Sequence, residues 1–267
     1  MTVPASSSAG REVPAYDRLD FSGPGRDSRY CLAVFVINEG PRLLSQLEKM
    51  ASWSGAVDIV VADGGSTDGS ITEDNLRPRG VSTALVKTGP GRLGAQMRMA
   101  FDYGLDQGYE GIVVMDGNDK DDPAAIPRFV EALAEGVDHV QGSRYVPGGR
   151  GVNTPWVRRW AVRWIHAPAI RLASGYPYTD TTNGFRAYSR ALLLDPAVDP
   201  FRVELSGYEL HYYLAIRAAR LGYRIREVPV TRAYPDRGPT PTKISPLRGN
   251  LRVLRALFDA CTGRLDP

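Results

Sequence analysis

The sequence predicts an α/β fold built on a mostly parallel sheet with helices on both faces. Apolar segments that are typical of strands (32–37, 57–62, 81–87 and 111–115) alternate with segments of helical pattern (41–51, 92–107 and 123–135), and this alternation favours a parallel sheet covered by helices. The strand segments are apolar throughout, as expected for strands buried on both faces. A chain of 267 residues is long enough for one such domain.

The second half of the chain is less regular. Residues 156–174 and 207–222 have helical patterns, 180–189 indicates a loop entering a strand, 223–234 alternates like a strand, and a basic helix is expected over 244–262. Pro229 predicts an edge strand, because proline cannot donate a ladder hydrogen bond. We expect three units: a disordered tail over 1–28, a main domain over 29–243, and a C-terminal basic amphipathic helix over 244–267.

Composition limits the class of protein. No apolar run approaches the roughly 20 residues of a membrane-spanning helix, and residues 1–28 lack the apolar stretch of a signal peptide. We therefore expect a cytoplasmic protein. Cys31 and Cys261 are the only cysteines and lack metal-ligand spacing. The net charge of +3 is modest, and no nucleic-acid partner is expected.

Charge is distributed unevenly along the chain. Residues 139–179 contain no acid but six arginines: Arg144, Arg150, Arg158, Arg159, Arg163 and Arg171. This purely basic segment follows an acidic cluster at 115–122, and such an asymmetry indicates an anionic partner.

Three polar clusters directly follow predicted strands: INEG (37–40), ADGGSTDGS (62–70) and MDGNDKDD (115–122). In parallel α/β sheets, ligands bind beyond the carboxyl ends of the strands. We therefore expect all three clusters to face one crevice.

The order of these motifs resembles a known family. A strand ending in Asn-Glu, a DGGSTDG turn, an acidic cluster after a strand, Gly-Ser-Arg (142–144) and Gly-Phe-Arg (184–186) together resemble the inverting glycosyltransferases of family 2. The pattern looks most like their dolichyl- or polyprenyl-phosphate sugar transferase branch. The resemblance spans about residues 31 to 245. It implies a GT-A-type, nucleotide-diphospho-sugar transferase fold, a UDP- or GDP-sugar donor and a lipid-phosphate acceptor.

The resemblance also implies roles for individual residues. Asp63 would accept an N–H of the donor base, with Asn38 and Glu39 near the base and ribose, while Gly65 permits close backbone approach. Asp116 matches the first aspartate of the family's Asp-x-Asp metal motif, and Asn118 stands where the second would be.

Asp116 and Asn118 would hold Mg²⁺ or Mn²⁺, which need few protein ligands when phosphates supply the others. Arg144 and Arg186 match positions near the diphosphate and the acceptor, where guanidinium groups can bind phosphate in bidentate fashion. Lys243 resembles a late lysine that comes over the phosphates from a hinged loop; a surface ion pair is the alternative for it.

The acceptor decides whether a general base is needed. A polyprenyl phosphate is already ionised near pH 7, because the second pKa of a phosphate monoester is about 6. A hydroxyl acceptor on a specialised-metabolite or nucleotide-like small molecule would need a carboxylate to take its proton. Asp119, Asp121 and Glu209 are the candidates for that base.

Other interpretations of the acidic cluster remain open. An EF-hand is excluded because Lys120 and Asp121 fall where an acceptor and the invariant glycine are required. Asp122 can simply cap a helix that begins at Pro123. Asn118 in place of an acid also allows a non-catalytic nucleotide-sugar-binding module.

Three tryptophans spaced four residues apart, Trp156, Trp160 and Trp164, predict one aromatic helical face. Such a stripe is usually core, but arginines without acids beside it are typical of a helix lying on anionic lipid. Peripheral contact with the inner membrane face through 156–171 and 244–262 is therefore expected.

Overall fold

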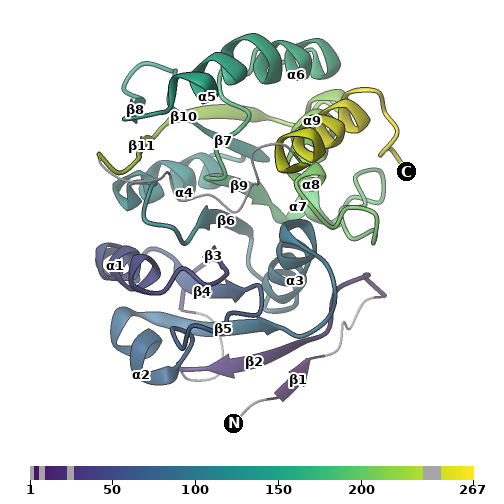
Figure 1. Cartoon of the computed structure of the whole chain (residues 1–267). Coiled ribbons are helices and arrows are strands. Elements are labelled where there is room, and N and C mark those ends of the chain that lie inside the picture. Colours follow the sequence, from purple (N-terminus) through teal and green to yellow (C-terminus); the bar gives the residue numbers. More distant parts are fainter. Residues whose placement is uncertain (1–2, 6–9, 23–26, 237–247) are drawn as a thin grey trace.

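A mixed sheet forms the centre of the computed structural model, which describes residues 3–5, 10–22, 27–236 and 248–267 (Figure 1). The strand order is β1-β2-β5-β4-β3-β6-β9-β7-β10, and a second small sheet pairs β11 with β8. The strands are β1 (Val3–Ala5), β2 (Tyr16–Asp20), β3 (Tyr30–Val36), β4 (Asp58–Asp63), β5 (Val81–Lys87), β6 (Gly111–Asp116), β7 (His139–Ser143), β8 (Arg150–Val152), β9 (Arg186–Ser189), β10 (Ile225–Pro229) and β11 (Thr231–Ala233).

Helices cover both faces of this sheet, as Figure 1 shows. One face carries α1 (Pro41–Met50), α2 (Glu73–Leu76) and α4 (Ile126–Ala134), and the other carries α3 (Leu93–Asp106), α7 (Arg190–Leu194) and α8 (Glu209–Arg220). Beyond the β10 end lie α5 (Trp156–Ala161), a π-helical turn η4 (Val162–His166), α6 (Ala167–Ser174) and α9 (Arg248–Cys261). Short 3-10 turns η1 (Ala51–Trp53), η2 (Arg77–Arg79) and η3 (Pro123–Ala125) complete the helical elements.

Two apolar layers bury the sheet. Leu43 and Leu47 of α1 pack with Phe129 of α4 on one face, and Phe101 of α3 packs with Leu214 of α8 on the other. Because the central strands are covered on both sides, β3 and β4 are buried along their whole length, which explains their unbroken apolar sequence.

The predicted α/β class is confirmed. Strands β5, β4, β3 and β6 run parallel, whereas β9 lies antiparallel between β6 and β7. Pro229 lies in β10, the edge strand next to β7, as its missing N–H requires.

The expectation of a disordered tail over 1–28 is wrong where the structure describes that segment. Strand β2 pairs antiparallel with β5, from Tyr16 opposite Lys87 to Asp20 opposite Thr83. Arg11 Nε also lies 2.5 Å from the buried Asp102 carboxylate of α3. Strand pairing and this ion pair outweigh the polar composition that suggested disorder.

The expected C-terminal amphipathic helix is present as α9. Its Ala256, Leu257 and Ala260 are buried against α6 and α8, while Leu251 and Phe258 remain exposed. Among the described residues, no helix is both long and apolar enough to cross a bilayer. Lys243 lies outside the described residues.

Candidate active site

The loops after β3 and β4 are joined by hydrogen bonds at the carboxyl edge of the sheet. Asn38 Oδ1 accepts from the Thr67 backbone N–H at 2.7 Å, and Asp68 Oδ2 accepts from the Gly40 N–H at 2.8 Å. The loop after β6 is tied to the same edge, because the Gly117 N–H donates to the Phe35 carbonyl at 2.7 Å. The three polar clusters therefore share one edge, as predicted.

Asp63 shapes its own loop. Its buried carboxylate accepts from the Gly65 and Ser66 N–H groups at 2.9 and 2.8 Å and from the Ser66 hydroxyl. Gly65 adopts φ 95°, a left-handed conformation that glycine tolerates at little cost. The contact of Asp63 with a donor base stays a prediction. Glu39 is paired with Arg42 at 2.6 Å.

Asp116, at the end of β6, meets an arginine that the sequence analysis did not identify. Arg232 Nη2 lies 3.1 Å from Asp116 Oδ2, and Arg232 Nη1 contacts Asp121. The Asn118 amide donates to the same Asp116 oxygen at 3.4 Å. Asp116, Asn118 and Arg232 thus form one group at the mouth of the crevice.

A divalent ion fits this group in part. Asn118 Oδ1 is a buried acceptor without a hydrogen-bond partner among the described residues. The amide nitrogen of the same side chain contacts the Asp116 carboxylate, so Asp116 and Asn118 offer an incomplete ligand set. In the described portion of the chain, no three His, Cys, Asp or Glu side chains gather into a metal cluster. Mg²⁺ and Mn²⁺ sites of this kind take their remaining ligands from substrate phosphates and water. Asp116 and Asn118 would therefore hold the ion together with a bound diphosphate.

Asp121 is engaged by Arg232, and its role as a general base stays a prediction. It is 2% exposed and paired with Arg232, and the backbones of these two residues form an isolated antiparallel bridge. Burial raises the pKa of Asp121 to about 6, although Arg232 opposes that rise. Its role in this structure is to hold Arg232.

Asp119 is engaged by α1, and its role as a catalytic base stays a prediction. Its carboxylate accepts from the Ser45 hydroxyl at 2.9 Å and from Lys49 Nζ at 2.7 Å, both on α1. A φ of 57° turns the backbone at this residue. Asp122, by contrast, caps η3 by accepting from the Ala124 N–H at 3.0 Å, which confirms the capping prediction.

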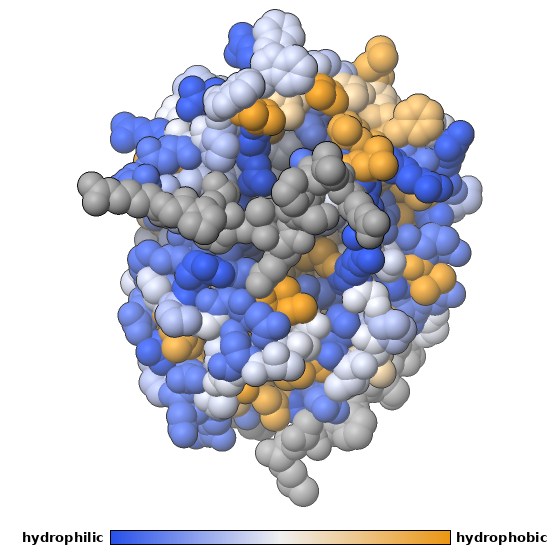
Figure 2. Space-filling model, viewed as in Figure 1, coloured by the Kyte–Doolittle hydropathy of each residue, from blue (hydrophilic) through white to orange (hydrophobic). Residues whose placement is uncertain are grey.

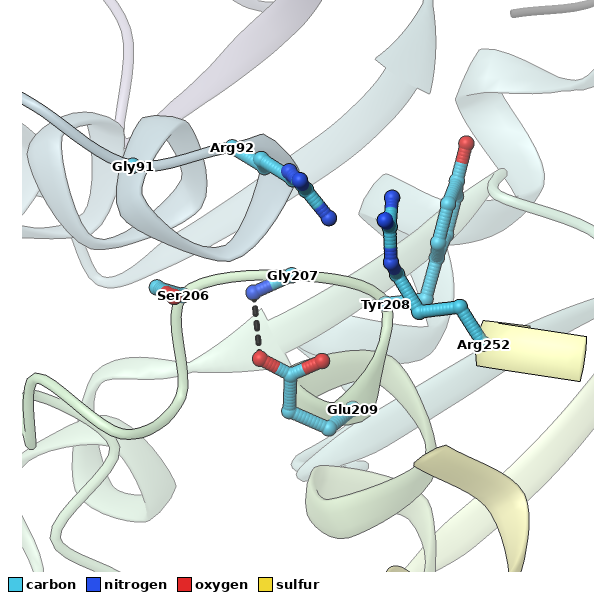
Figure 3. Close-up of a pocket in the computed structure, with 7 residues that line it drawn as sticks. All are labelled: Gly91, Arg92, Ser206, Gly207, Tyr208, Glu209 and Arg252. Carbon is cyan, nitrogen blue, oxygen red and sulfur yellow. Dashed lines mark hydrogen bonds between the residues drawn. The ribbon is translucent and has the colours of Figure 1, made fainter. Parts of the chain in front are cut away.

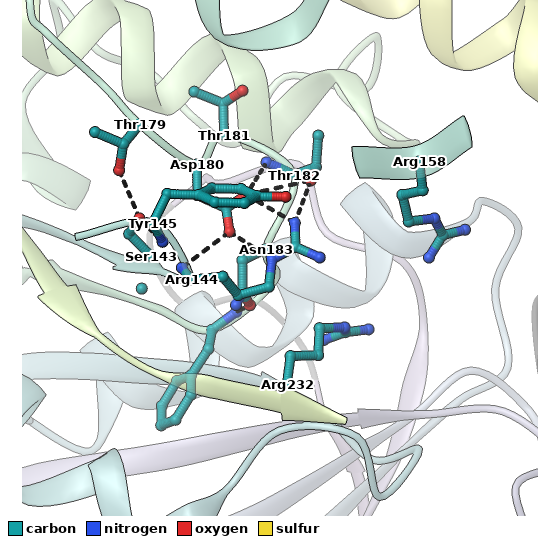
Figure 4. Close-up of polar contacts among 12 residues, drawn as sticks. Ser143, Arg144, Tyr145, Arg158, Thr179, Asp180, Thr181, Thr182, Asn183 and Arg232 are labelled. Atoms are coloured by element: carbon teal, nitrogen blue, oxygen red, sulfur yellow. Dashed lines mark hydrogen bonds and ion pairs between the residues drawn. The ribbon is translucent and has the colours of Figure 1, made fainter. Parts of the chain in front are cut away.

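The two arginines expected at the phosphates are held by protein groups instead. Arg144 is bidentate to Asp180, at 2.7 and 2.9 Å, and Figure 4 shows this pair with Arg158 and Arg232 nearby. Arg186, 1% exposed, donates to the carbonyls of Thr181, Asn183 and His211 at 2.6 to 3.0 Å. Each buried guanidinium thus has the internal acceptors that it needs. The expected direct contacts of Arg144 and Arg186 with phosphate stay predictions.

Other cations converge at the ring of Tyr234. Lys120 Nζ, Arg158 Cζ and Arg232 Cζ lie 5.6, 5.5 and 6.0 Å from its centroid. Arg158 Nη1 also donates to the Tyr234 hydroxyl at 2.8 Å. Burial would raise the pKa of Tyr234, but Arg232, Arg158 and Arg144 outweigh it and lower the pKa. We call Lys120, Arg158, Arg232 and Tyr234 the cation cluster.

Glu209 lines a cavity of about 370 Å³ beside the cluster. The other lining residues are Gly91, Arg92, Ser206, Gly207, Tyr208 and Arg252. Figure 3 shows the side chains of Arg92 and Arg252 directed into the same space above Glu209. Burial raises the pKa of the Tyr208 hydroxyl, and the nearby Asp116 charge adds to this rise.

The tryptophan stripe is on the surface rather than in the core. Trp156, Trp160 and Trp164 are 77%, 53% and 62% exposed. Leu172 of α6 and the α9 residues Leu251, Leu254 and Phe258 are also exposed, and Figure 2 shows apolar side chains gathered over this end of the molecule. Arg159, Arg163 and Arg255 are exposed on the same helices.

The sequence of the chain is similar to those of known glycosyltransferases. A family model described as glycosyl transferase family 2 matches residues 31–195. An undecaprenyl-phosphate mannosyltransferase of Micrococcus luteus is 37% identical over 178 residues, which cover 65% of this chain and 71% of that protein. A polyprenol monophosphomannose synthase of Mycolicibacterium smegmatis is 34% identical over 217 residues, covering 79% and 78%.

Solved structures confirm the GT-A-like fold. The glucosyl-3-phosphoglycerate synthase of Mycobacterium tuberculosis, in complex with Mn²⁺ and UDP-glucose, aligns with a TM-score of 0.62 at 20% identity, covering 96% of this chain and 81% of that one. The family model and the curated relatives define a glycosyltransferase. The chain belongs to glycosyltransferase family 2.

The sequence analysis missed Arg158, Arg232 and Tyr234 as a group. Arg158 was treated only as part of a basic helix, and Arg232 and Tyr234 as part of an alternating strand. Arg232 lies 116 residues after Asp116, so no local spacing could have paired them. An arginine just after an edge strand was the one available signal.

Proposed function

We propose that this enzyme transfers a sugar from a nucleotide-diphosphate sugar to a polyprenyl-phosphate-type acceptor, with inversion at the anomeric carbon. The cation cluster is the observation that supports this proposal. Its Arg232 contacts both Asp116, at the end of β6, and Asp121. Its Arg158 and Lys120 both lie near the Tyr234 ring. Such a cluster suits two phosphate-bearing substrates. The names of the two bacterial relatives support a lipid-phosphate acceptor.

The reaction needs no general base under this proposal. An ionised phosphate oxygen of the acceptor attacks the anomeric carbon and forms the new carbon–oxygen bond, while the bond to the donor's diphosphate breaks. The nucleoside diphosphate leaves with the bonding electron pair, and the cation cluster stabilises its charge. A divalent ion bound with the diphosphate would neutralise part of the same charge. The engagement of Asp119 with α1 and of Asp121 with Arg232 is consistent with this chemistry.

We assign Glu209 to binding the sugar of the donor. It accepts from the Gly207 N–H and faces a cavity that also exposes Arg92 and Arg252. A carboxylate and backbone polar groups in a cavity of this size are suited to sugar hydroxyls. The alternative is a hydroxyl acceptor, with Glu209 as its base, because this carboxylate lines the cavity.

The exposed aromatic and basic surface supports peripheral contact with an anionic membrane. Trp156, Trp160 and Trp164 offer apolar rings, and Arg159 and Arg163 on the same helical segment supply positive charge. This combination is typical of helices that lie in the headgroup region of a bilayer. A membrane-bound acceptor would then be presented beside the cation cluster, since Arg158 belongs to the same helix, α5.

The test is a transfer assay with purified protein, Mn²⁺ and a panel of radiolabelled UDP- and GDP-sugars. We expect transfer to polyprenyl phosphate in detergent and none to the matching polyprenol, which lacks the ionised oxygen. Glu209→Gln should raise KM for the sugar nucleotide while leaving the pH profile of kcat unchanged. Transfer to small hydroxyl acceptors with none to polyprenyl phosphate, and a Glu209-dependent pH profile, would favour the alternative.

A further inference from the structure

The place where a metal ion is expected is unusually rich in fixed positive charge. Asp116 is the only carboxylate of the Asp116–Asn118 pair, and Arg232 already pairs with it at 3.1 Å. Lys120, two residues beyond Asn118, is 7% exposed and shares the Tyr234 ring with Arg232. A free divalent cation approaching Asp116 therefore meets the Asp116 carboxylate and the Asn118 amide, with the cations Lys120 and Arg232 close by and the Asp121 carboxylate already paired with Arg232.

We propose that Lys120 and Arg232 supply part of the positive charge on the leaving diphosphate, so that the enzyme binds nucleoside diphosphate without metal and binds metal only after the nucleotide. This inference rests on the proposed use of a nucleotide-sugar donor. It goes beyond that proposal by assigning a specificity-determining role to Lys120 and an order to binding.

Electrostatics support the order of binding. The affinity of hard cations for oxygen sites depends on the number of charged ligands, and Asn118 removes one charge while Arg232 offsets another. A bound diphosphate supplies new anionic oxygens and changes the sign of the local charge. The ion then gains ligands that the protein alone does not provide.

The position of Lys120 is fixed by its backbone. Its carbonyl accepts from the Ala233 N–H at 2.8 Å, and the Asp122 N–H donates to the Thr231 carbonyl at 3.0 Å. These bonds join the segment after β6 to β11, the strand that carries Arg232. The two cations are therefore held in place before any substrate binds, which lowers the reorganisation needed to stabilise charge.

The test compares binding of UDP and GDP with binding of their monophosphates, by titration calorimetry in EDTA and in Mn²⁺. We expect the wild type to bind its preferred diphosphate in EDTA. Lys120→Gln should weaken diphosphate binding in EDTA on the order of tenfold or more, because a charge-assisted contact is lost. Its effect on the monophosphate should be several-fold smaller. Mn²⁺ should restore much of the lost diphosphate affinity.

Metal binding to the nucleotide-free protein gives a second readout. Electron paramagnetic resonance should detect little bound Mn²⁺ in the wild type, whereas Asn118→Asp combined with Lys120→Gln should bind it at least tenfold more tightly. Lys49→Gln is the matched control, because it removes a lysine charge near Asp119 but outside the cation cluster. Thermal denaturation of each variant separates misfolding from a specific effect.

The outcomes distinguish this inference from the proposed function. If neither UDP nor GDP binds under any condition, the donor proposal itself fails. If a diphosphate binds only with Mn²⁺, or if Lys120→Gln behaves like Lys49→Gln, the donor proposal stands and the role of Lys120 is overturned. Tight Mn²⁺ binding by the nucleotide-free wild type would also overturn it.

Discussion

Arg232 lies 3.1 Å from Asp116, although 116 residues separate the two in the chain. Asp116 ends β6 in the middle of the sheet, and Arg232 belongs to β11 just beyond the β10 edge. Under the proposed mechanism, this cation would help to stabilise the departing diphosphate. Asp121 contacts the same guanidinium and so determines where that charge sits.

Arg232→Met should destabilise the protein by about 3–5 kcal/mol, because it leaves Asp121 buried without its partner. Arg232→Met combined with Asp121→Asn should recover at least about 1 kcal/mol of that loss, since position 121 then carries no unpaired buried charge. Urea denaturation at pH 8 measures both. Arg226→Met, which breaks an exposed pair with Glu135, should cost less than about 1 kcal/mol. A double variant no more stable than the single one would contradict the pairing.

Asp116→Asn and Asp119→Asn should differ sharply in activity. Asp116 belongs to the group formed with Asn118 and Arg232, so its neutralisation should lower kcat on the order of a hundredfold or more. Asp119 contacts α1, so its variant should keep kcat within about threefold and lose about 1 kcal/mol of stability at most. Steady-state kinetics checks this difference. If Asp119→Asn lowers kcat as much as Asp116→Asn does, Asp119 acts in catalysis.

Arg186→Met tests a structural role against a phosphate-binding one. The variant removes the Arg186 donor from three buried carbonyls, and the free energy of unfolding should fall by about 3 kcal/mol or more. Below the melting transition, the folded variant should still bind nucleoside diphosphate like the wild type. Arg163→Met, at an exposed position, should change neither property. If Arg186→Met loses affinity for the diphosphate while its stability is unchanged, Arg186 binds phosphate directly.

Changing Trp156, Trp160 and Trp164 together to serine should abolish most binding to anionic vesicles and leave the melting temperature nearly unchanged. The rings are already exposed in the free protein, so their removal costs little folding energy, while a bilayer would bury them. Co-sedimentation with vesicles containing phosphatidylglycerol measures the effect. Leu194→Ser with Val203→Ser, at exposed positions outside α5, α6 and α9, is the control. An equal loss of vesicle binding in the control variant would contradict the proposal that the three tryptophans form the membrane-binding surface.

Acidification below pH 6.5 should destabilise the protein through His139 and His211. Burial, aided by Arg186, lowers the pKa of both far below 6.5, so the folded state keeps them neutral while the unfolded chain takes up protons. Stability is therefore highest above the unfolded pKa and falls by about 1.4 kcal/mol per pH unit for each histidine below it. Denaturation of wild type and His139→Phe between pH 7 and 5 should show the shallower slope in the variant. Identical slopes would exclude His139 as a contributor.

Sequence periodicity and strand-end motifs were sufficient for the fold and for the location of the site. Strands β3 to β6 are apolar because helices cover both faces, and that pattern is visible in the sequence. The three polar clusters follow strand ends, and parallel strands end at one edge. Asp122 as a cap and Pro229 at an edge are also local properties, so they were predictable.

Tertiary structure alone decided which charged groups face the crevice. Asp119 turns toward Lys49 because its backbone has a positive φ, and Arg186 turns inward toward three carbonyls. Lys120 and Arg232 come together through backbone hydrogen bonds between segments more than a hundred residues apart. Sequence by itself determined the sheet, its carboxyl edge and the Asp116–Asn118 pair. The cation cluster depends on contacts between residues that are distant in the sequence. Electrostatic attraction acts through space, so these contacts produce no periodic pattern in the sequence.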